Sequence, residues 1–159
     1  MDEIFRQTMD DFASVWQRVG GMPSPAAPDA DGTEFLRRFL REAYCDALYY
    51  TSLSRMFPAS GRNTLLGHAQ EAKTCCRTLR AEYFIRTGET IAPKENCPLV
   101  GGKLASLRSV MLRESEQAKA LRQAAQAVSD EALCTLFLRL AEDADRRAQT
   151  DRALLLDCF

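Results

Sequence analysis

Apolar residues recur every three or four positions along most of the chain, the spacing of helices that pack against one another. The clearest case is the stretch from Phe35 to Met56. Its predicted core-facing line consists of Phe35, Phe39, Glu42, Asp46, Tyr49, Leu53 and Met56. Two acidic residues, Glu42 and Asp46, interrupt this apolar line. A bare carboxylate is expensive to bury, so these residues need a cation, an arginine partner or a proton.

The same pattern predicts four long helices, separated by segments that contain Pro, Gly or Ser. They run from about residue 33 to 57, 63 to 87, 103 to 128 and 129 to 156. Asp31 or Thr33 is the candidate cap of the first helix, and Gly88 is a good C-cap for the second. A shorter amphipathic helix is expected over 4–19, followed by a Pro-rich linker. We therefore expect an N-terminal helix and linker over 1–32 and a bundle over 33–159.

Loop lengths predict how the four helices connect. The first and last connections have about five and about two residues, so each joins an antiparallel hairpin. The middle connection has about fourteen residues and can span about 45 Å, whereas a helix of about 25 residues is about 37 Å long. It can therefore deliver the third helix parallel to the second. Two hairpins joined by one long crossover form the ferritin-like arrangement, so we expect an all-α, ferritin-like four-helix bundle with an extra N-terminal helix.

Composition narrows the classes of partner. The net charge is −1, which indicates neither a nucleic acid nor an acidic membrane as a partner. No apolar run approaches the roughly 20 residues that cross a bilayer, and the acidic N-terminus does not read as a signal peptide. We therefore expect a cytoplasmic protein. Of the 21 basic residues 17 are Arg, the residue type better suited to buried ion pairs.

The six cysteines contain no C-x-x-C pair, so local spacing predicts neither a zinc ribbon nor a rubredoxin iron centre. We interpret them as buried free thiols in a reducing compartment. The alternative is a reactive vicinal pair, Cys75–Cys76, acting as a thiol-based redox sensor together with Cys45.

Glutamates repeat at matching places in the two predicted hairpins. Glu42 precedes Glu71 by 29 residues, and Glu114 precedes Glu142 by 28. A pseudo-twofold duplication would place these four glutamates, one per helix, at a similar height in the core. Such a set, with Glu-x-x-His on two of the helices, can bind two Fe or Mn ions.

The chain from about residue 33 to 156 resembles the ferritin-like superfamily, and within it the rubrerythrin-type di-iron proteins. The matching positions are Glu42 with Tyr49 one helical repeat later, Glu71 in HAQEAKT, Glu114 in LRESEQA and Glu142 in LAEDADR. The resemblance implies that the four glutamates bind a di-iron centre that reduces peroxide or activates oxygen. Tyr49 would then support the site through a hydrogen bond.

The chain departs from this family at both histidines. Thr74 and Asp145 stand where Glu-x-x-His would place them, and the only histidine, His68, lies one turn before Glu71. Asp145, Asp46 or His68 are therefore candidate additional ligands. The rubredoxin-like module often attached to rubrerythrins is absent from this sequence, so a peroxidase would need an external electron donor.

Two states of the core follow. With metal, Glu42, Glu71, Glu114 and Glu142 are ligands, and the chain is a di-iron peroxidase or oxidase. Without metal, repulsion and burial raise some carboxyl pKa values, and basic side chains pair with them. The candidate partners are Arg139, Arg146 and Lys73. The missing histidines and the arginine content favour a degenerate site, weakly metal-binding or non-catalytic.

The apolar N-terminal helix and Leu154–Leu156 indicate a homodimer, or else simply cap the bundle.

Overall fold

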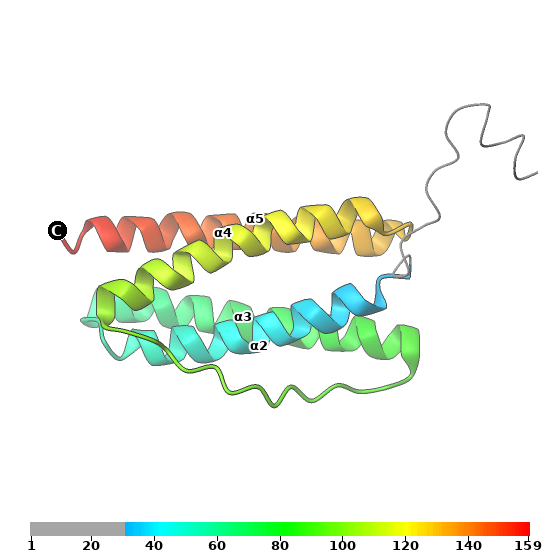
Figure 1. The fold of residues 1–159 in the computed structure, drawn as a ribbon, viewed down its shortest axis with the longest axis horizontal. Coiled ribbons are helices and arrows are strands. Elements are labelled where there is room, and N and C mark those ends of the chain that lie inside the picture. The colour runs from blue at the N-terminus through cyan, green and yellow to red at the C-terminus, as the bar shows by residue number, and fades with distance from the viewer. Residues whose placement is uncertain (1–30) are drawn as a thin grey trace, which may run out of the picture.

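The computed structural model describes residues 31–159, which form four α-helices (Figure 1). With the labels of Figure 1, they are α2 (Thr33–Ser54), α3 (Ala59–Thr87), α4 (Lys103–Ala127) and α5 (Glu131–Leu156). The all-helical prediction is confirmed over this range. The helix predicted over 4–19 lies outside the described residues. Within them, no helix is long and apolar enough to cross a membrane.

The helix ends follow the predicted capping residues only in part, because the N-cap of α2 is Gly32, without a side-chain cap, and not Asp31 or Thr33. Asp31 accepts a hydrogen bond of 2.9 Å from the N–H of Thr33, and Asp130 accepts one from Leu133 at the start of α5. Gly88 ends α3 with a φ of 71°, as predicted. The start of α3 was predicted too late, because Gly61 was expected to lie in a turn. Gly61 is helical and packs so closely on Phe57 that a Cβ would lie 3.0 Å from its ring.

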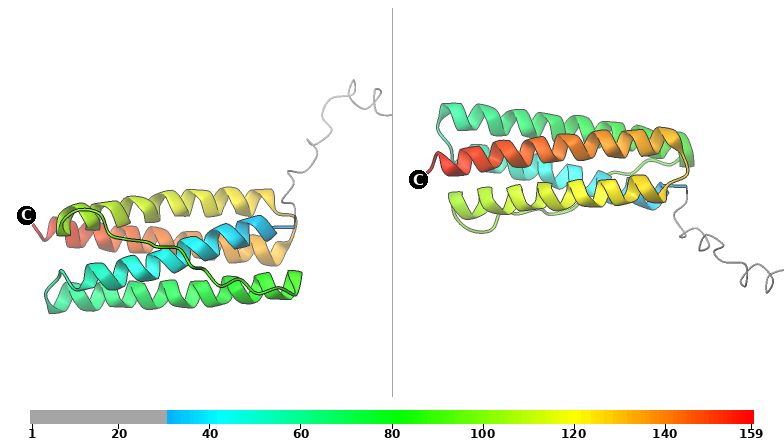
Figure 2. Two further views of the ribbon diagram at one scale, coloured as in Figure 1. Left: turned by 60° about the horizontal axis from the view of Figure 1, so that its bottom comes forward. Right: turned by 90° about the horizontal axis from the view of Figure 1, so that it is seen from above.

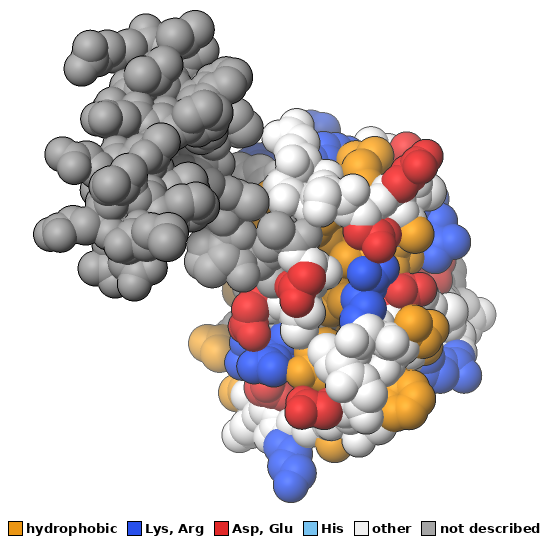
Figure 3. Space-filling model, turned by 90° about the vertical axis from the view of Figure 1, so that its right-hand side faces the viewer, with side chains coloured by type: hydrophobic (Ala, Val, Ile, Leu, Met, Phe, Trp, Pro, Cys, Tyr) orange, Lys and Arg blue, Asp and Glu red, His pale blue; other side chains and the backbone are white. Residues whose placement is uncertain are grey.

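The helices are arranged as two antiparallel hairpins, α2–α3 and α4–α5. Residues 88–102 connect the two hairpins by running along the length of the bundle. As a result, α3 and α4 point the same way (Figures 1 and 2). The described chain begins at the end of the bundle that holds the α4–α5 turn. Seen from that end, apolar side chains lie scattered among charged ones (Figure 3).

The crossover is fixed over α2. Cys97 in the crossover forms a disulfide with Cys45 in α2, with 5.5 Å between their Cα atoms. Ile91 and Leu99 pack against the two halves of the hydrophobic core. The expectation of six free thiols is therefore wrong for this pair. The two cysteines are 52 residues apart, so only the path of the crossover brings them together.

The core consists of two apolar clusters separated by a polar layer. The larger cluster fills the half of the bundle around Phe39, Leu79 and Phe137. The smaller one surrounds Tyr50, Leu65 and Leu107. Buried polar residues of all four helices lie between them, namely Asp46, His68, Glu114, Arg147 and Asp151. This layer is the most unusual feature of the fold, because polar groups are costly to bury without partners.

The core-facing line of α2 was predicted only in part. Phe39, Asp46 and Leu53 are buried as expected, whereas Met56 is 43% exposed. Tyr50, not Tyr49, is fully buried. The heptad spacing drifts by about 20° per repeat in a straight helix, so a line drawn at strict steps of four and three turns by about 60° over the three repeats from residue 35 to 56 and leaves the buried face.

Candidate functional site

An ion pair between Glu114 of α4 and Arg147 of α5 forms the centre of the polar layer. Arg147 Nε donates to Glu114 Oε1 at 2.8 Å, and Arg147 Nη2 donates to Oε2 at 2.9 Å. Glu114 is 1% exposed and Arg147 is 7% exposed. Two parallel hydrogen bonds of this kind are the strongest arrangement for an arginine and a carboxylate. The guanidinium therefore occupies both oxygens of the only one of the four predicted glutamates that is buried.

The hydroxyl of Tyr50 links this ion pair to a second carboxylate. It lies 2.9 Å from Glu114 Oε1 and 2.7 Å from Asp151 Oδ2. A phenol carries one proton, so both contacts are hydrogen bonds only when one of the two carboxyl groups is protonated. Tyr50 comes from α2 and the carboxylates from α4 and α5, so this contact joins the two hairpins.

His68 of α3 completes the layer. Its Nδ1 lies 3.3 Å from Asp151 Oδ1, and its ring packs edge-on against Tyr50 with 5.1 Å between the centroids. Neither His68 Nδ1 nor Asp151 Oδ1 has a well-aligned hydrogen bond among the described residues. His68 thus lies beside Asp151, and its role as a metal ligand with Glu71 stays a prediction.

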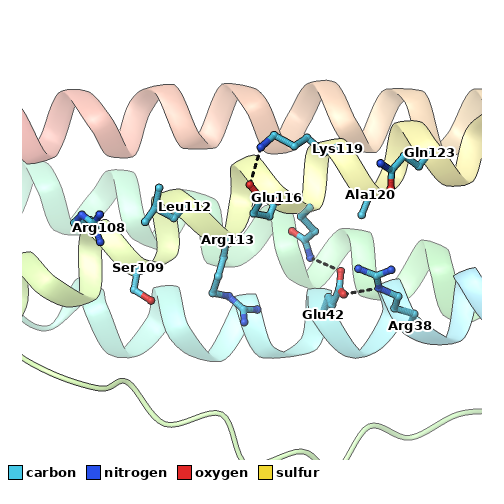
Figure 4. A pocket seen from close by; sticks show the side chains of 11 residues that line it. Arg38, Glu42, Arg108, Ser109, Leu112, Arg113, Glu116, Lys119, Ala120 and Gln123 are labelled. Carbon is cyan, nitrogen blue, oxygen red and sulfur yellow. Dashed lines mark hydrogen bonds and ion pairs between the residues drawn. The ribbon is translucent and has the colours of Figure 1, made fainter.

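Asp46 connects the layer to the surface. It accepts hydrogen bonds from Arg113 at 2.9 Å and from Gln117 at 3.0 Å. Gln117 also donates to Glu42 Oε2 at 3.3 Å, and Arg38 donates to Glu42 Oε1 at 2.9 Å. Figure 4 shows Arg38, Glu42 and Arg113 in a groove of about 630 Å³ between α2 and α4. Glu42 therefore faces this groove.

Burial sets the electrostatics of the layer. It raises the pKa of Glu114 above its ordinary value, and the hydrogen bonds and charge of Arg147 offset only part of the rise. Burial likewise raises the pKa of Asp46, against the attraction of Arg113. Burial alone would lower the pKa of Arg147, but its hydrogen bonds to Glu114 and the charge of that carboxylate raise it. The layer thus holds one permanent cation, Arg147.

Burial, with the nearby charges of Glu114 and Asp151, raises the pKa of Tyr50 well above its ordinary value. The phenol is therefore a hydrogen-bond donor and not a base. A cavity of about 20 Å³ adjoins the layer beside Asp46, Cys75 and Arg147. It has room for one water molecule, so this cavity has no space for an organic substrate.

The four predicted glutamates do not converge. Glu114 is buried, Glu42 faces the α2–α4 groove, and Glu142 is exposed on α5. Glu71 lines a separate groove between α3 and α5, where Arg146 Nη2 donates to it at 2.9 Å. Partial burial alone would raise the pKa of Glu71, but Arg146 and Arg147 hold it below its ordinary value.

The remaining candidate residues are also paired with basic groups. Asp145 forms an ion pair with Arg122 of α4. Among the predicted basic partners, Arg146 pairs with Glu71 and Asp143, whereas Arg139 and Lys73 form no ion pair within residues 31–159. In residues 31–159 no group of three or more His, Cys, Asp or Glu side chains is placed to hold a metal ion. As arranged, these residues do not fit a di-metal centre, and metal binding by them stays a prediction.

The vicinal thiols are poor candidates for redox chemistry. Burial raises the pKa of Cys75 to about 12 and raises that of Cys76 above its ordinary value. Since the thiolate is the reactive form, a raised pKa makes both thiols less reactive, and their role as a redox sensor stays a prediction. Cys45, the third member of the proposed sensor, is already in the disulfide.

Sequence reasoning missed Arg147, Asp151 and Tyr50. A signal for the first two was present in α5, where the buried line advances by four, three, four, three and four residues. It runs through Leu133, Phe137, Leu140, Ala144, Arg147 and Asp151. The glutamate repeat had pointed instead to Glu142, which lies on another side of the same helix.

No family model matches the chain, and neither the curated proteins nor the solved structures include a significant match.

Proposed function

We propose that this chain is a ferritin-like bundle of the rubrerythrin type in which an internal ion-pair network takes the place of the di-metal centre. The protein would then be non-catalytic, or at most weakly metal-binding, and would act through association with other molecules. The observation that carries this proposal is the Arg147 guanidinium on both oxygens of Glu114. A guanidinium there supplies the positive charge that a metal ion would otherwise supply to the buried carboxylate.

Two further observations support the proposal. The exposed position of Glu142 removes one of the four carboxylates from the core. The cavity beside the layer is limited to the size of one water molecule.

The homodimer and the cytoplasmic location stay predictions. The Cys45–Cys97 disulfide is more typical of oxidising compartments than of the cytoplasm.

Metal analysis tests the proposal. The protein is purified without chelators, its Fe and Mn content is measured, and its thermal unfolding is recorded with added Fe(II), Mn(II) or EDTA. We expect no stoichiometric metal and the same midpoint in all conditions, because ligands that bind the native state raise it. Two metal ions per chain, or a lower midpoint with EDTA, would favour the di-iron peroxidase or oxidase instead.

A further inference from the structure

The outer face of the α2–α3 hairpin carries a groove with an apolar floor and basic walls. Its volume is about 430 Å³. Tyr44, Ala47 and Leu48 line it from α2, and Lys73, Cys76 and Arg77 line it from α3. Leu48 is 38% exposed. An apolar floor of this kind, rimmed by polar residues, is typical of a surface that another element covers.

The groove continues along one stripe of α3. The stripe consists of Leu66, Lys73, Arg77, Arg80 and Phe84, which recur at helical spacing. Leu66 and Phe84, at the ends of the stripe, are 43% and 52% exposed. Leu66 and Phe84 are 18 helical steps apart, which is about 27 Å at 1.5 Å per residue. The stripe is thus apolar at both ends and basic in the middle.

The basic side chains of the stripe have no acidic partners within residues 31–159. Among the described residues, Lys73 and Arg80 form no ion pair, and Arg77 donates only to Thr74, at 3.3 Å. The acidic residues of α3 pair elsewhere, Glu71 with Arg146 and Glu82 with Arg86. In the larger α2–α4 groove three of the four basic side chains, Arg38, Arg113 and Lys119, are each paired with a carboxylate.

The first 30 residues complement this stripe in charge. They carry five acidic and two basic side chains, which leaves 17 acidic and 19 basic ones on the rest of the chain. Their predicted helix over 4–19 places Phe5, Met9, Phe12, Trp16 and Val19 along one side. Sixteen helical residues are about 24 Å long, close to the length of the stripe.

The connection is long enough for the segment to reach the groove of its own chain. Residues 20–32 can extend to about 43 Å at about 3.3 Å each. The groove residue Tyr44 lies eleven residues beyond Thr33 in α2, which is about 17 Å along the helix. A second copy of the chain is therefore not needed to supply the segment.

We propose that residues 1–30 dock intramolecularly on the α2–α3 groove, with the apolar side of their helix on its floor and their excess of acidic side chains attracted by the basic stripe. This inference does not depend on the proposed loss of the metal centre. It explains why the stripe has cations without partners and apolar ends. It also provides a binding surface on the same chain for the N-terminal segment, which is acidic and has one apolar side.

Trp16 provides a direct test, because it is the only tryptophan of the chain. In the full chain we expect its fluorescence to be shielded from acrylamide, independently of protein concentration. The variant K73E/R77E/R80E should expose it, with a several-fold larger quenching constant. These three residues are exposed, so circular dichroism should show an intact bundle. Combining this variant with D10K/D11K should restore the shielding.

The matched control is R139E/R152E, which reverses two exposed arginines of α5 and should leave Trp16 shielded. Raising the salt concentration should weaken the shielding, since salt screens exposed charges. Full exposure of Trp16 in the parent chain, or no effect of K73E/R77E/R80E, would overturn the proposal. Shielding that depends on protein concentration would overturn it as well, because a second copy would then be the partner.

Discussion

At the scale of single residues, the polar layer depends on the hydroxyl of Tyr50 and the guanidinium of Arg147. Among the described residues, only Tyr50 has a side chain within hydrogen-bonding distance of both Glu114 and Asp151. A buried carboxylate that loses a hydrogen-bond partner keeps the cost of its desolvation. Loss of the Tyr50 hydroxyl should therefore lower the free energy of unfolding by more than one ordinary hydrogen bond contributes.

The change Tyr50→Phe removes this hydroxyl without leaving a large cavity. We expect the free energy of unfolding at neutral pH to fall by about 1–3 kcal/mol, the usual cost of an unsatisfied buried polar group. Urea denaturation measures it. Tyr49→Phe is the matched control, because the hydroxyl of Tyr49 has no hydrogen bond within the described chain and its ring packs under Arg113. Equal effects of the two changes would contradict the assigned role of Tyr50.

At the scale of elements, the start of α5 depends on a charged cap. The N–H of Leu133 donates to Asp130 Oδ1 at 2.9 Å, and Arg86 of α3 donates to its other oxygen at 3.2 Å. The hydrogen bond from Leu133, followed by those from Arg86, holds the pKa of Asp130 below its ordinary value. A lowered pKa means that the folded state favours the ionised carboxylate.

We expect Asp130→Ala to lower the thermal midpoint at pH 7. The contribution of the ionised carboxylate is fully present above its unfolded pKa of about 3.9. It is lost as the pH falls through the lower folded value, so the difference between variant and parent should shrink in acid. Asp130→Asn, which keeps a capping oxygen, should cost less. A difference that stays constant from pH 7 to pH 2 would show that the charge of Asp130 is not involved.

The crossover is the second element with a specific anchor. Replacing Cys45 and Cys97 by Ser should lower the free energy of unfolding by about 2–4 kcal/mol, the usual effect of a native disulfide. It should also speed up hydrogen exchange in residues 88–102. Cys134→Ser is the control, since Cys134 is a free thiol. Detection of six reactive thiols in the denatured, unreduced parent protein would contradict the disulfide.

The elements could be predicted from the sequence, whereas the contacts of the polar layer could not. Helical periodicity, Gly88 and the loop lengths were sufficient to find four helices and their connection, because these signals are local. The partner of Glu114 depends on how far α4 and α5 slide and rotate against each other, and no local signal fixes that. The equal spacing of the glutamates therefore suggested a common site, although Glu142 points to solvent.

At the scale of the whole molecule, the polar layer joins the two hairpins in the middle of the bundle. Tyr50 and His68 from one hairpin meet Glu114, Arg147 and Asp151 from the other. A buried network of this kind adds little net stability compared with an apolar core. It does disfavour other registers of the helices, because a shift of one turn would leave charged groups buried without partners.

A double-mutant cycle between Glu114 and Arg147 tests the central claim most directly, with unfolding free energy as the measured quantity. Arg147→Met should cost about 3–5 kcal/mol, because it leaves a buried carboxylate without its cation. Glu114→Gln combined with Arg147→Met should cost less than the sum of the single changes. Arg146→Met, at a largely exposed pair with Glu71, should cost at most about 1 kcal/mol. Strictly additive effects of the two core changes, or an Arg147→Met no worse than Arg146→Met, would contradict the account.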